Sequence, residues 1–513
     1  MKVIKYTHFK NILLFLFVFT IPAVASVNDS LNFITKSNFS LTPVAVVGAI
    51  KIYPKEFING FDYGPAFIRK MENPRLAYLK YMINERLLAL YGLEIRVDTL
   101  AQVKETFNTF SNDLMTEKMF REEILPKVKL SENEVDTVIN QKLLHLKIKW
   151  IFYRNNSEKK FIYSKLNNKE YFDSIFSEQF KSGFKRDERE LGITRYHLGQ
   201  RNPELAKIID TLTIGKVSKP FYKNGGWYIF KLEKAWKDLI VSEGQYNRLK
   251  SEAITAVKKR KIDILSDLYV KKIMENNSPI IKRIPLNITT AFIADFMLSR
   301  KKYKDWKVSS FLKKAVRKSG IQSPPPANRL HLIQYKSGYI SIRQFLIWFR
   351  TRIEYIKLDK TNFDTFYASV EQLVWRMTRD TFLTLDAERK GYDKNPEVLE
   401  QKKWWWDKIL YSAARNSLSE AVILKLNENN LINADTSKPT KEKINYQLGV
   451  KIFRTLQQMK TKYPVVINYK LLNSLKLFDE KDKKAVDFYT VKKGGLIPRT
   501  PYPTIDFEWK NWE

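Results

Sequence analysis

The chain has 513 residues, of which 44% are apolar and 28% charged, and its formal net charge is +35. This composition excludes general disorder, and the length predicts about three domains. So large a positive charge would attract any polyanion, including nucleic acid, anionic lipid and acidic polypeptide. The absence of cysteine excludes disulfides and thiol nucleophiles, and four histidines leave little for a histidine-based metal site. Phosphate-binding glycine loops are absent as well, so we expect no metal and no cofactor.

The N-terminus has the pattern of a secretory signal peptide, which we place at residues 1–25. Three lysines precede an apolar run at 12–19, and Ala23 and Ala25 supply small side chains at the two positions that a signal peptidase reads. A retained membrane anchor is the alternative, but the run is short for a bilayer span. Export argues against a nucleic-acid partner, whereas an anionic membrane surface and unfolded exported chains remain candidates.

Residues 40–143 predict a helical module that opens with a hairpin. Apolar runs on either side of Gly48 predict two short strands, and Pro54 is suited to the first turn of a helix. The next helix has one apolar face and ends at Gly92. The positions on that face are Leu79, Met82, Ile83, Leu87 and Leu90.

At His145 the hydrophobic period changes from that of a helix to that of a strand. Residues 146–153 alternate and then become continuously apolar, which predicts the central strand of a small sheet. A further strand, a polar loop, a helix opened at Pro203, a turn at Gly215 and two more strands complete the pattern. Residues 144–238 therefore predict one compact α+β domain.

Five short segments of this domain resemble the parvulin-type peptidyl-prolyl isomerase domain of the SurA/PrsA class of exported foldases. They occur in the family's order and with its spacing, so together they are fairly specific for the fold. The segments, each with the family's pattern, are Leu146 to Tyr153 (V-R-A-R-H-I-L-V), Glu190 to Gly192 (G-G-D-L-G), Pro203 to Leu205 (P-E-F), Ile214 to Pro220 (P-G-E-V-S-x-P) and Gly226 to Leu232 (G-Y-H-I-I-K-L).

The resemblance implies two histidines that face each other across the sheet, beside an apolar pocket for proline. In this chain those positions are Trp150 and Tyr228, and Leu205 stands where the family has its pocket phenylalanine. We therefore assign no catalytic residue, and expect isomerase activity to be weak or lost. Trp150, Leu205 and Tyr228 are candidates for a pocket that binds proline-containing peptides, with simple core packing as the alternative. His145 should project from the opposite face of the strand to Trp150, and His197 is placed in the loop.

Residues 239–322 predict a helical extension. In the family a helix after the isomerase domain returns to pack on the N-terminal helices, and the resemblance implies the same packing here. A proline run at 324–326 marks a linker. At the other end of the chain, residues 476–513 predict an extended and aromatic C-terminal extension.

An internal repeat begins after the linker, and we place a second helical module at residues 330–475. It reproduces the strand, glycine turn, strand and helix start of the first module, and in both copies an isoleucine precedes a phenylalanine by five residues. The two pairs are Ile52 with Phe57 and Ile340 with Phe345. No second isomerase motif follows. The run Trp404 to Trp406 has two interpretations, which are core and rim packing or contact with a peptide or a lipid.

These features predict an α+β protein in which mostly helical chaperone modules surround one small, degenerate parvulin-like domain. The resemblance implies a periplasmic chaperone, either a holdase or a foldase, for unfolded exported or outer-membrane proteins. Outer-membrane assembly machinery is a further candidate partner. Two alternatives stay open, namely an active peptidyl-prolyl cis-trans isomerase and a structural subunit of an envelope secretion or assembly complex.

Overall fold

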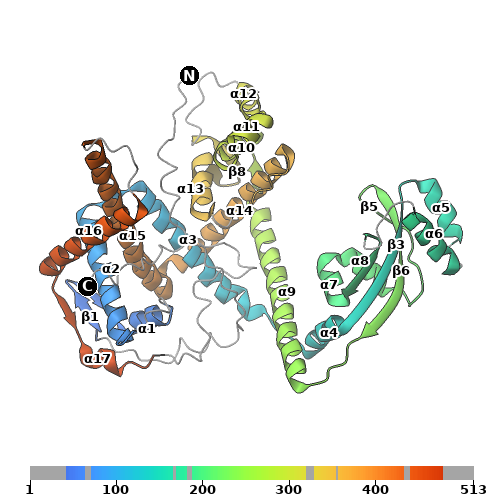
Figure 1. Ribbon diagram of the computed structural model, residues 1–513, viewed down its shortest axis with the longest axis horizontal. Coiled ribbons are helices and arrows are strands. Elements are labelled where there is room, and N and C mark those ends of the chain that lie inside the picture. Colours follow the sequence, from blue (N-terminus) through green and yellow to red (C-terminus); the bar gives the residue numbers. More distant parts are fainter. Residues whose placement is uncertain are drawn as a thin grey trace. The chain divides into compact units, whose positions relative to one another are not determined.

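The computed structural model describes residues 42–63, 71–165, 169–181, 188–318, 329–353, 356–432 and 440–477 (Figure 1). The predicted signal peptide, the proline linker and all but the start of the C-terminal extension lie outside these ranges. The fold is mostly helical with small antiparallel sheets, so the predicted α+β class is confirmed. The described residues form two compact units, one within Met1–Leu125 and Ser266–Glu513 and the other within Pro126–Leu265. We call them the helical unit and the inserted unit.

The helical unit begins with the predicted hairpin. Strands β1 (Ala45–Val47) and β2 (Ile50–Ile52) pair antiparallel around Gly48, whose φ of 57° is a conformation that glycine adopts without strain. Pro54 is the first residue of α1 (Pro54–Tyr63), as predicted. Three elements follow, namely α2 (Pro74–Glu94), the 3₁₀ helix η2 (Val97–Thr99) and α3 (Ala101–Glu123).

The remaining elements of the helical unit follow the inserted unit in the chain. They are the later part of α9 (Glu243–Asn277), β7 (Ile280–Ile281), α10 (Arg283–Met297), α11 (Arg300–Asp305), α12 (Val308–Lys318), β8 (His331–Tyr335), β9 (Gly338–Ser341), α13 (Ile342–Arg352), α14 (Phe363–Arg389), the 3₁₀ helix η7 (Tyr392–Lys394), α15 (Pro396–Ile432), α16 (Lys441–Lys462), β10 (Val465–Ile467) and α17 (Tyr469–Ser474). The strands and helix start expected after residue 330 are therefore present as β8, β9 and α13. No helix in the described ranges is long and apolar enough to span a bilayer.

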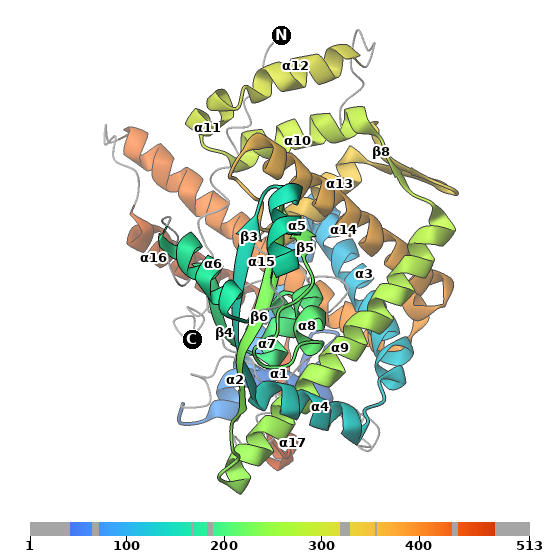
Figure 2. The ribbon, with the colours of Figure 1, turned by 90° about the vertical axis from the view of Figure 1, so that its right-hand side faces the viewer.

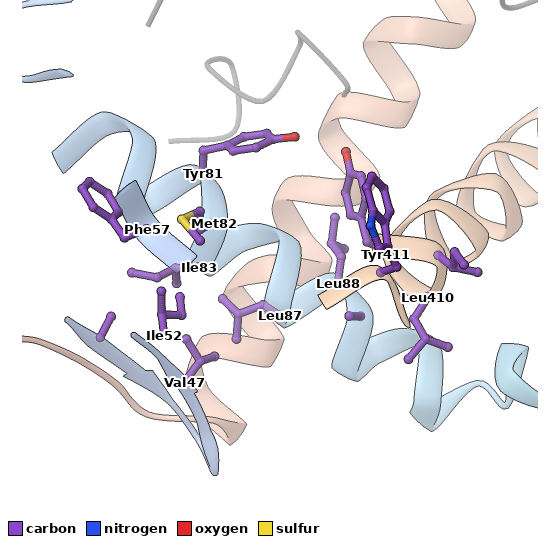
Figure 3. Packing of buried hydrophobic residues seen from close by; sticks show 14 of the residues in the cluster. Val47, Ile52, Phe57, Tyr81, Met82, Ile83, Leu87, Leu88, Leu410 and Tyr411 are labelled. Atoms are coloured by element: carbon purple, nitrogen blue, oxygen red, sulfur yellow. The ribbon is translucent and has the colours of Figure 1, made fainter. Parts of the chain in front are cut away.

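Two hydrophobic cores hold the helical unit together. In the first, the hairpin residues Val47 and Ile52 lie beneath Ile83 of α2, and Leu88 of α2 lies beside Tyr411 of α15 (Figure 3). The second core joins α10, α12, α13 and α14 to the strands β8 and β9 (Figure 2). Burial of these apolar faces provides the main stabilisation of the unit.

The tryptophan run of α15 packs into the first of these cores. Trp405 is 4% exposed, and its ring centroid lies 4.8 Å from that of Phe110 on α3. Trp404 and Trp406 are half-buried against the same core. The contacts agree with the interpretation of core and rim packing.

The inserted unit contains a four-stranded antiparallel sheet of order β4-β3-β6-β5. A capping box of Ser131 with Glu134 opens its first helix. Its elements are α4 (Glu132–Leu143), β3 (Leu144–Tyr153), α5 (Asn156–Lys165), α6 (Lys169–Lys181), β4 (Glu190–Thr194), α7 (Arg195–Arg201), α8 (Pro203–Asp210), β5 (Phe221–Lys223), β6 (Gly226–Lys237) and the first part of α9. Helices α7 and α8 cover one face of the sheet, and α5 and α6 lie on the other (Figure 1).

One local prediction in this unit is wrong. The segment between β4 and α8 was expected to be a polar loop that carries His197, but it forms the seven-residue helix α7. Thr194 caps the helix, because its hydroxyl accepts a hydrogen bond from the His197 N–H at 3.3 Å. The segment has few apolar residues, but Leu198 is buried against the sheet and anchors the helix there.

Candidate functional site

The three predicted pocket residues come together on one face of the inserted unit's sheet. Strands β3 and β6 pair so that Trp150 lies opposite Phe230 and Phe152 lies opposite Tyr228. Trp150, Leu205 and Tyr228 all pack in the cluster beneath α7 and α8. Leu205 is 7% exposed, whereas Trp150 and Tyr228 are half-buried. The Trp150 and Tyr228 rings are thus partly open to solvent.

Other rings extend this surface into an aromatic shelf, which we define as Trp150, Phe152, Phe221, Tyr228 and Phe230. The Tyr228 and Phe230 rings are stacked, with centroids 6.0 Å apart and planes 7° from parallel. Phe152 lies 4.9 Å from Tyr228, and Phe221 lies 6.4 Å from Phe230. Phe230 is buried, while the other four rings are half-buried and form the accessible part of the shelf.

A set of polar contacts fixes the position of Phe152 in the shelf. The Gln179 side chain accepts a hydrogen bond from the Phe152 N–H at 3.2 Å and donates one to its carbonyl at 2.9 Å. The same amide oxygen accepts a hydrogen bond from the Arg189 guanidinium at 3.0 Å. Arg189 also lies 5.5 Å from the centre of the Phe152 ring, and burial lowers the pKa of its guanidinium. Because several contacts restrain Phe152, the shelf is a preformed surface.

The two histidines of the inserted unit contact residues outside the shelf. His145 Nε2 is 2.8 Å from Asp238 Oδ2, and the ring stacks on Trp236 at 5.2 Å. It is on the odd-numbered face of β3, opposite to Trp150, as predicted. His197 Nδ1 is 2.8 Å from Thr194 Oγ1 in α7. The shelf itself consists of aromatic and apolar side chains, so what it offers a bound peptide is apolar contact and stacking.

The described part of the chain contains no cluster of three or more His, Cys, Asp or Glu side chains able to hold a metal ion. What the shelf can bind follows from its chemistry. Aromatic faces stack well on proline rings and on other apolar side chains, and a proline has no N–H that would need a partner there.

An open groove lies on the opposite face of the same unit. It has a volume of about 500 Å³ and is lined by Lys160, Tyr163, Ser164, Lys219, Pro220 and Trp227. The Trp227 ring lies 5.1 Å from that of Tyr222. Two lysines and two aromatic rings would suit an extended peptide with an acidic side chain. Sequence reasoning missed this groove, because α5 and the strands β5 and β6 are far apart in the chain.

Two shelf residues could also have been found from the sequence. Phe152 is two residues after Trp150 on the same strand, so both side chains must share a face. Phe221 directly follows Pro220, the last residue of the motif that starts at Ile214. Arg189 and Gln179 carried no such signal, because they reach the shelf only through the tertiary fold.

Comparisons with known proteins add a distant structural similarity. The chain is similar to the crystal structure of the foldase protein PrsA from Streptococcus pneumoniae, with 12% sequence identity over 43% of this chain and 89% of that one, and a TM-score of 0.19. A score this low does not establish a shared fold. No family model matches the chain, and no curated protein matches it either.

Proposed function

We propose that the protein is a chaperone for unfolded polypeptides, and that its inserted unit is a parvulin-like domain that binds peptides without efficient catalysis. The aromatic shelf carries this proposal. Two half-buried rings, Trp150 and Tyr228, replace the pair of histidines expected from the family, so a surface that would perform proton chemistry is instead apolar and able to stack on proline.

The inferred mechanism is reversible capture. Apolar and proline-containing segments of an unfolded chain would lie against the shelf, which shields them from one another and so slows aggregation. Because the shelf is preformed, capture loses little conformational entropy on the protein side. Release needs no chemical step, since the contacts are stacking and burial only. The barrier to rotation about an X-Pro bond is about 20 kcal/mol, and an apolar surface alone would lower it only slightly.

The location and the partners belong to the same proposal. The basic N-terminal segment with its apolar run at 12–19 supports export to the periplasm with removal of residues 1–25. There the clients would be unfolded exported or outer-membrane proteins, and an anionic membrane surface would attract the basic chain. Contact with outer-membrane assembly machinery is the further partner that such a role implies.

An aggregation assay tests the chaperone proposal. The mature protein should suppress aggregation of an unfolded outer-membrane protein at stoichiometric amounts, and the double variant Trp150→Ala with Tyr228→Ala should lose most of that effect. Tyr246→Ala is the matched control, because Tyr246 is 37% exposed in the same unit but belongs to neither the shelf nor the groove. No suppression by the wild-type protein at stoichiometric excess would refute the proposal.

A protease-coupled proline-peptide assay separates binding from catalysis. We expect turnover close to the uncatalysed baseline for the wild-type protein. Clear turnover that Leu205→Ala or Tyr228→Ala abolishes would instead establish an active isomerase. The two assays are independent. A chaperone without catalysis suppresses aggregation but gives baseline turnover, whereas an active isomerase gives turnover above the baseline.

A further inference from the structure

The two hairpins of the helical unit have the same register. Ala45 pairs with Ile52 in the first hairpin, and Ile333 pairs with Ile340 in the second. A fully buried phenylalanine follows five residues later in each copy, Phe57 in α1 and Phe345 in α13. The hairpins therefore match residue by residue, and not merely as elements of the same kind.

The helices that follow each hairpin also correspond. A left-handed residue comes two positions after the last residue of each helix, Arg96 with φ 62° after α2 and Gly391 with φ 79° after α14. A three-residue 3₁₀ helix and then a long helix come next in both copies, η2 with α3 and η7 with α15. When the two sequences are aligned on these left-handed residues, Glu85 corresponds to Asp380 and Phe110 to Trp405.

The third strand of each sheet comes from the other copy. Strand β7 follows the first copy through α9, yet it pairs with β8 of the second, where Ile281 lies opposite Ile333. Strand β10 follows the second copy through α16, yet it pairs with β1 of the first, where Ile467 lies opposite Ala45. The two terminal strands are thus exchanged.

The hydrogen bonds at the ends of these strands repeat as well. The Asn468 N–H donates to the Val44 carbonyl at 2.8 Å, and the Lys282 N–H donates to the Leu332 carbonyl at 2.9 Å. In both sheets the helix that follows then buries a leucine five residues after the paired isoleucine, Leu472 in α17 and Leu286 in α10.

The long helices are exchanged in the same reciprocal way. Helix α2 of the first copy packs on α15 of the second, and α14 of the second packs on α3 of the first. Each contact contains a buried acid. Glu85 of α2 forms an ion pair with Lys408 of α15, and Arg352 lies between Asp380 of α14 and Asp113 of α3.

The strongest sign of symmetry is at the centre of this interface. Phe110 and Trp405 occupy corresponding positions in the two copies, and their rings contact each other with centroids 4.8 Å apart. Corresponding residues of a twofold pair meet only at the symmetry axis. The axis of a pseudo-twofold arrangement therefore passes between these two buried rings.

We infer that the helical unit is two copies of one structural unit that form a strand-exchanged dimer within a single chain. Each copy presents the edge of its hairpin and its two long helices as one surface. The partner that fits this surface is another copy of the same structural unit. Along the chain, the inserted unit separates α3 from the later part of α9 in the first copy, whereas α16 is the next described element after α15 in the second. This inference does not depend on the proposed function.

Engineered disulfides test the strand exchange in the full-length chain, which has no cysteine of its own. Two double variants each place a pair of cysteines across exchanged strands. Each should oxidise to an intramolecular disulfide in a monomer. They are Ala45→Cys with Ile467→Cys, and Ile333→Cys with Ile281→Cys. The matched controls use the same positions in the unexchanged combinations, Ala45→Cys with Ile281→Cys and Ile333→Cys with Ile467→Cys, and should remain reduced.

Three outcomes would overturn the inference. The first is that the control pairs oxidise. The second is that the exchanged pairs stay reduced although circular dichroism shows that the variant has folded. The third is that the disulfides form between two chains rather than within one. A second measurement covers variants that fail to fold. A protease site placed between Lys318 and Arg329 of the otherwise unchanged chain should allow cleavage into two fragments that co-elute one to one until denaturant is added. Separation in native buffer would refute the exchange.

Discussion

A few buried charges hold the helical unit together at positions where its helices meet. Arg352 is 2% exposed, and its guanidinium donates to Asp113 at 2.7 Å. The neighbouring Asp380 accepts a hydrogen bond from the Trp348 indole N–H at 2.9 Å, and burial raises the pKa of its carboxyl. A buried ion pair contributes less than its Coulomb energy suggests, but loss of one partner leaves the other charge without compensation.

Arg352→Met should therefore destabilise the protein by about 3 kcal/mol, because the buried carboxylates of Asp113 and Asp380 both lose their ion pair with Arg352, while Arg379 still donates to Asp380. The measurement is the denaturant midpoint of unfolding, followed by tryptophan fluorescence. Lys223→Met removes one partner of an exposed ion pair with Glu204 and is the matched control, for which we expect almost no shift. Equal midpoints for the two variants would contradict the role of the buried pair.

Glu134 gives a prediction for the dependence of stability on pH. Hydrogen bonds from Lys261 and from Ser131 lower the pKa of its carboxyl to about 2 in the folded protein. A lowered pKa stabilises the fold above the unfolded value of about 4.3, and this contribution is lost as pH falls toward the folded value. Glu134→Gln keeps the cap but removes the charge. The gap in thermal midpoint between wild type and variant should be full at pH 6 and shrink steadily toward pH 2. A gap that does not change with pH would exclude the Lys261 pair as its source.

At the scale of elements, local patterns in the sequence predicted much of the fold. The hairpin at Gly48 and the start of α1 at Pro54 are set by neighbours in the chain, so the sequence alone predicted them. Helix α7 was missed because its anchor comes from the tertiary fold, in which Leu198 is buried against the sheet. The exchange of β7 and β10 could not be foreseen, since no local pattern states which hairpin a distant strand will join.

Strand β6 begins at a glycine whose small size the shelf requires. A Cβ at Gly226 would lie 2.1 Å from the Phe152 ring and 2.9 Å from the Tyr153 carbonyl oxygen. Gly226→Ala should therefore displace Phe152 and cost about 1–3 kcal/mol, in proportion to the overpacking. Gly192→Ala is the matched control, because the added methyl group meets nothing within 4 Å. Thermal unfolding of both variants tests this prediction. An unchanged thermal midpoint for Gly226→Ala would show that the Phe152 ring moves aside without cost.

At the scale of the whole molecule, the charge and the shelf have separate roles. In the proposed chaperone, the shelf and the groove would bind short segments of a client, whereas the positive charge would attract an acidic client before contact, whatever its sequence. Removal of residues 1–25 takes away three lysines and leaves the chain strongly basic. A chaperone built this way would meet acidic clients quickly and retain them by apolar contact.

The association rate should therefore depend on salt only for acidic clients. Steering by a field of this kind accelerates association by about 10-fold or more, and a Debye length of about 10 Å at 0.1 M salt screens most of it. Stopped-flow tryptophan fluorescence can compare an unfolded acidic polypeptide with a neutral one of equal length. Raising the salt should slow capture of the acidic client several-fold and leave the dissociation rate of both clients nearly unchanged, because apolar stacking on Trp150 and Tyr228 is not weakened by ions. If both clients slowed equally, the effect would be general, and the net charge would have no part in client selection.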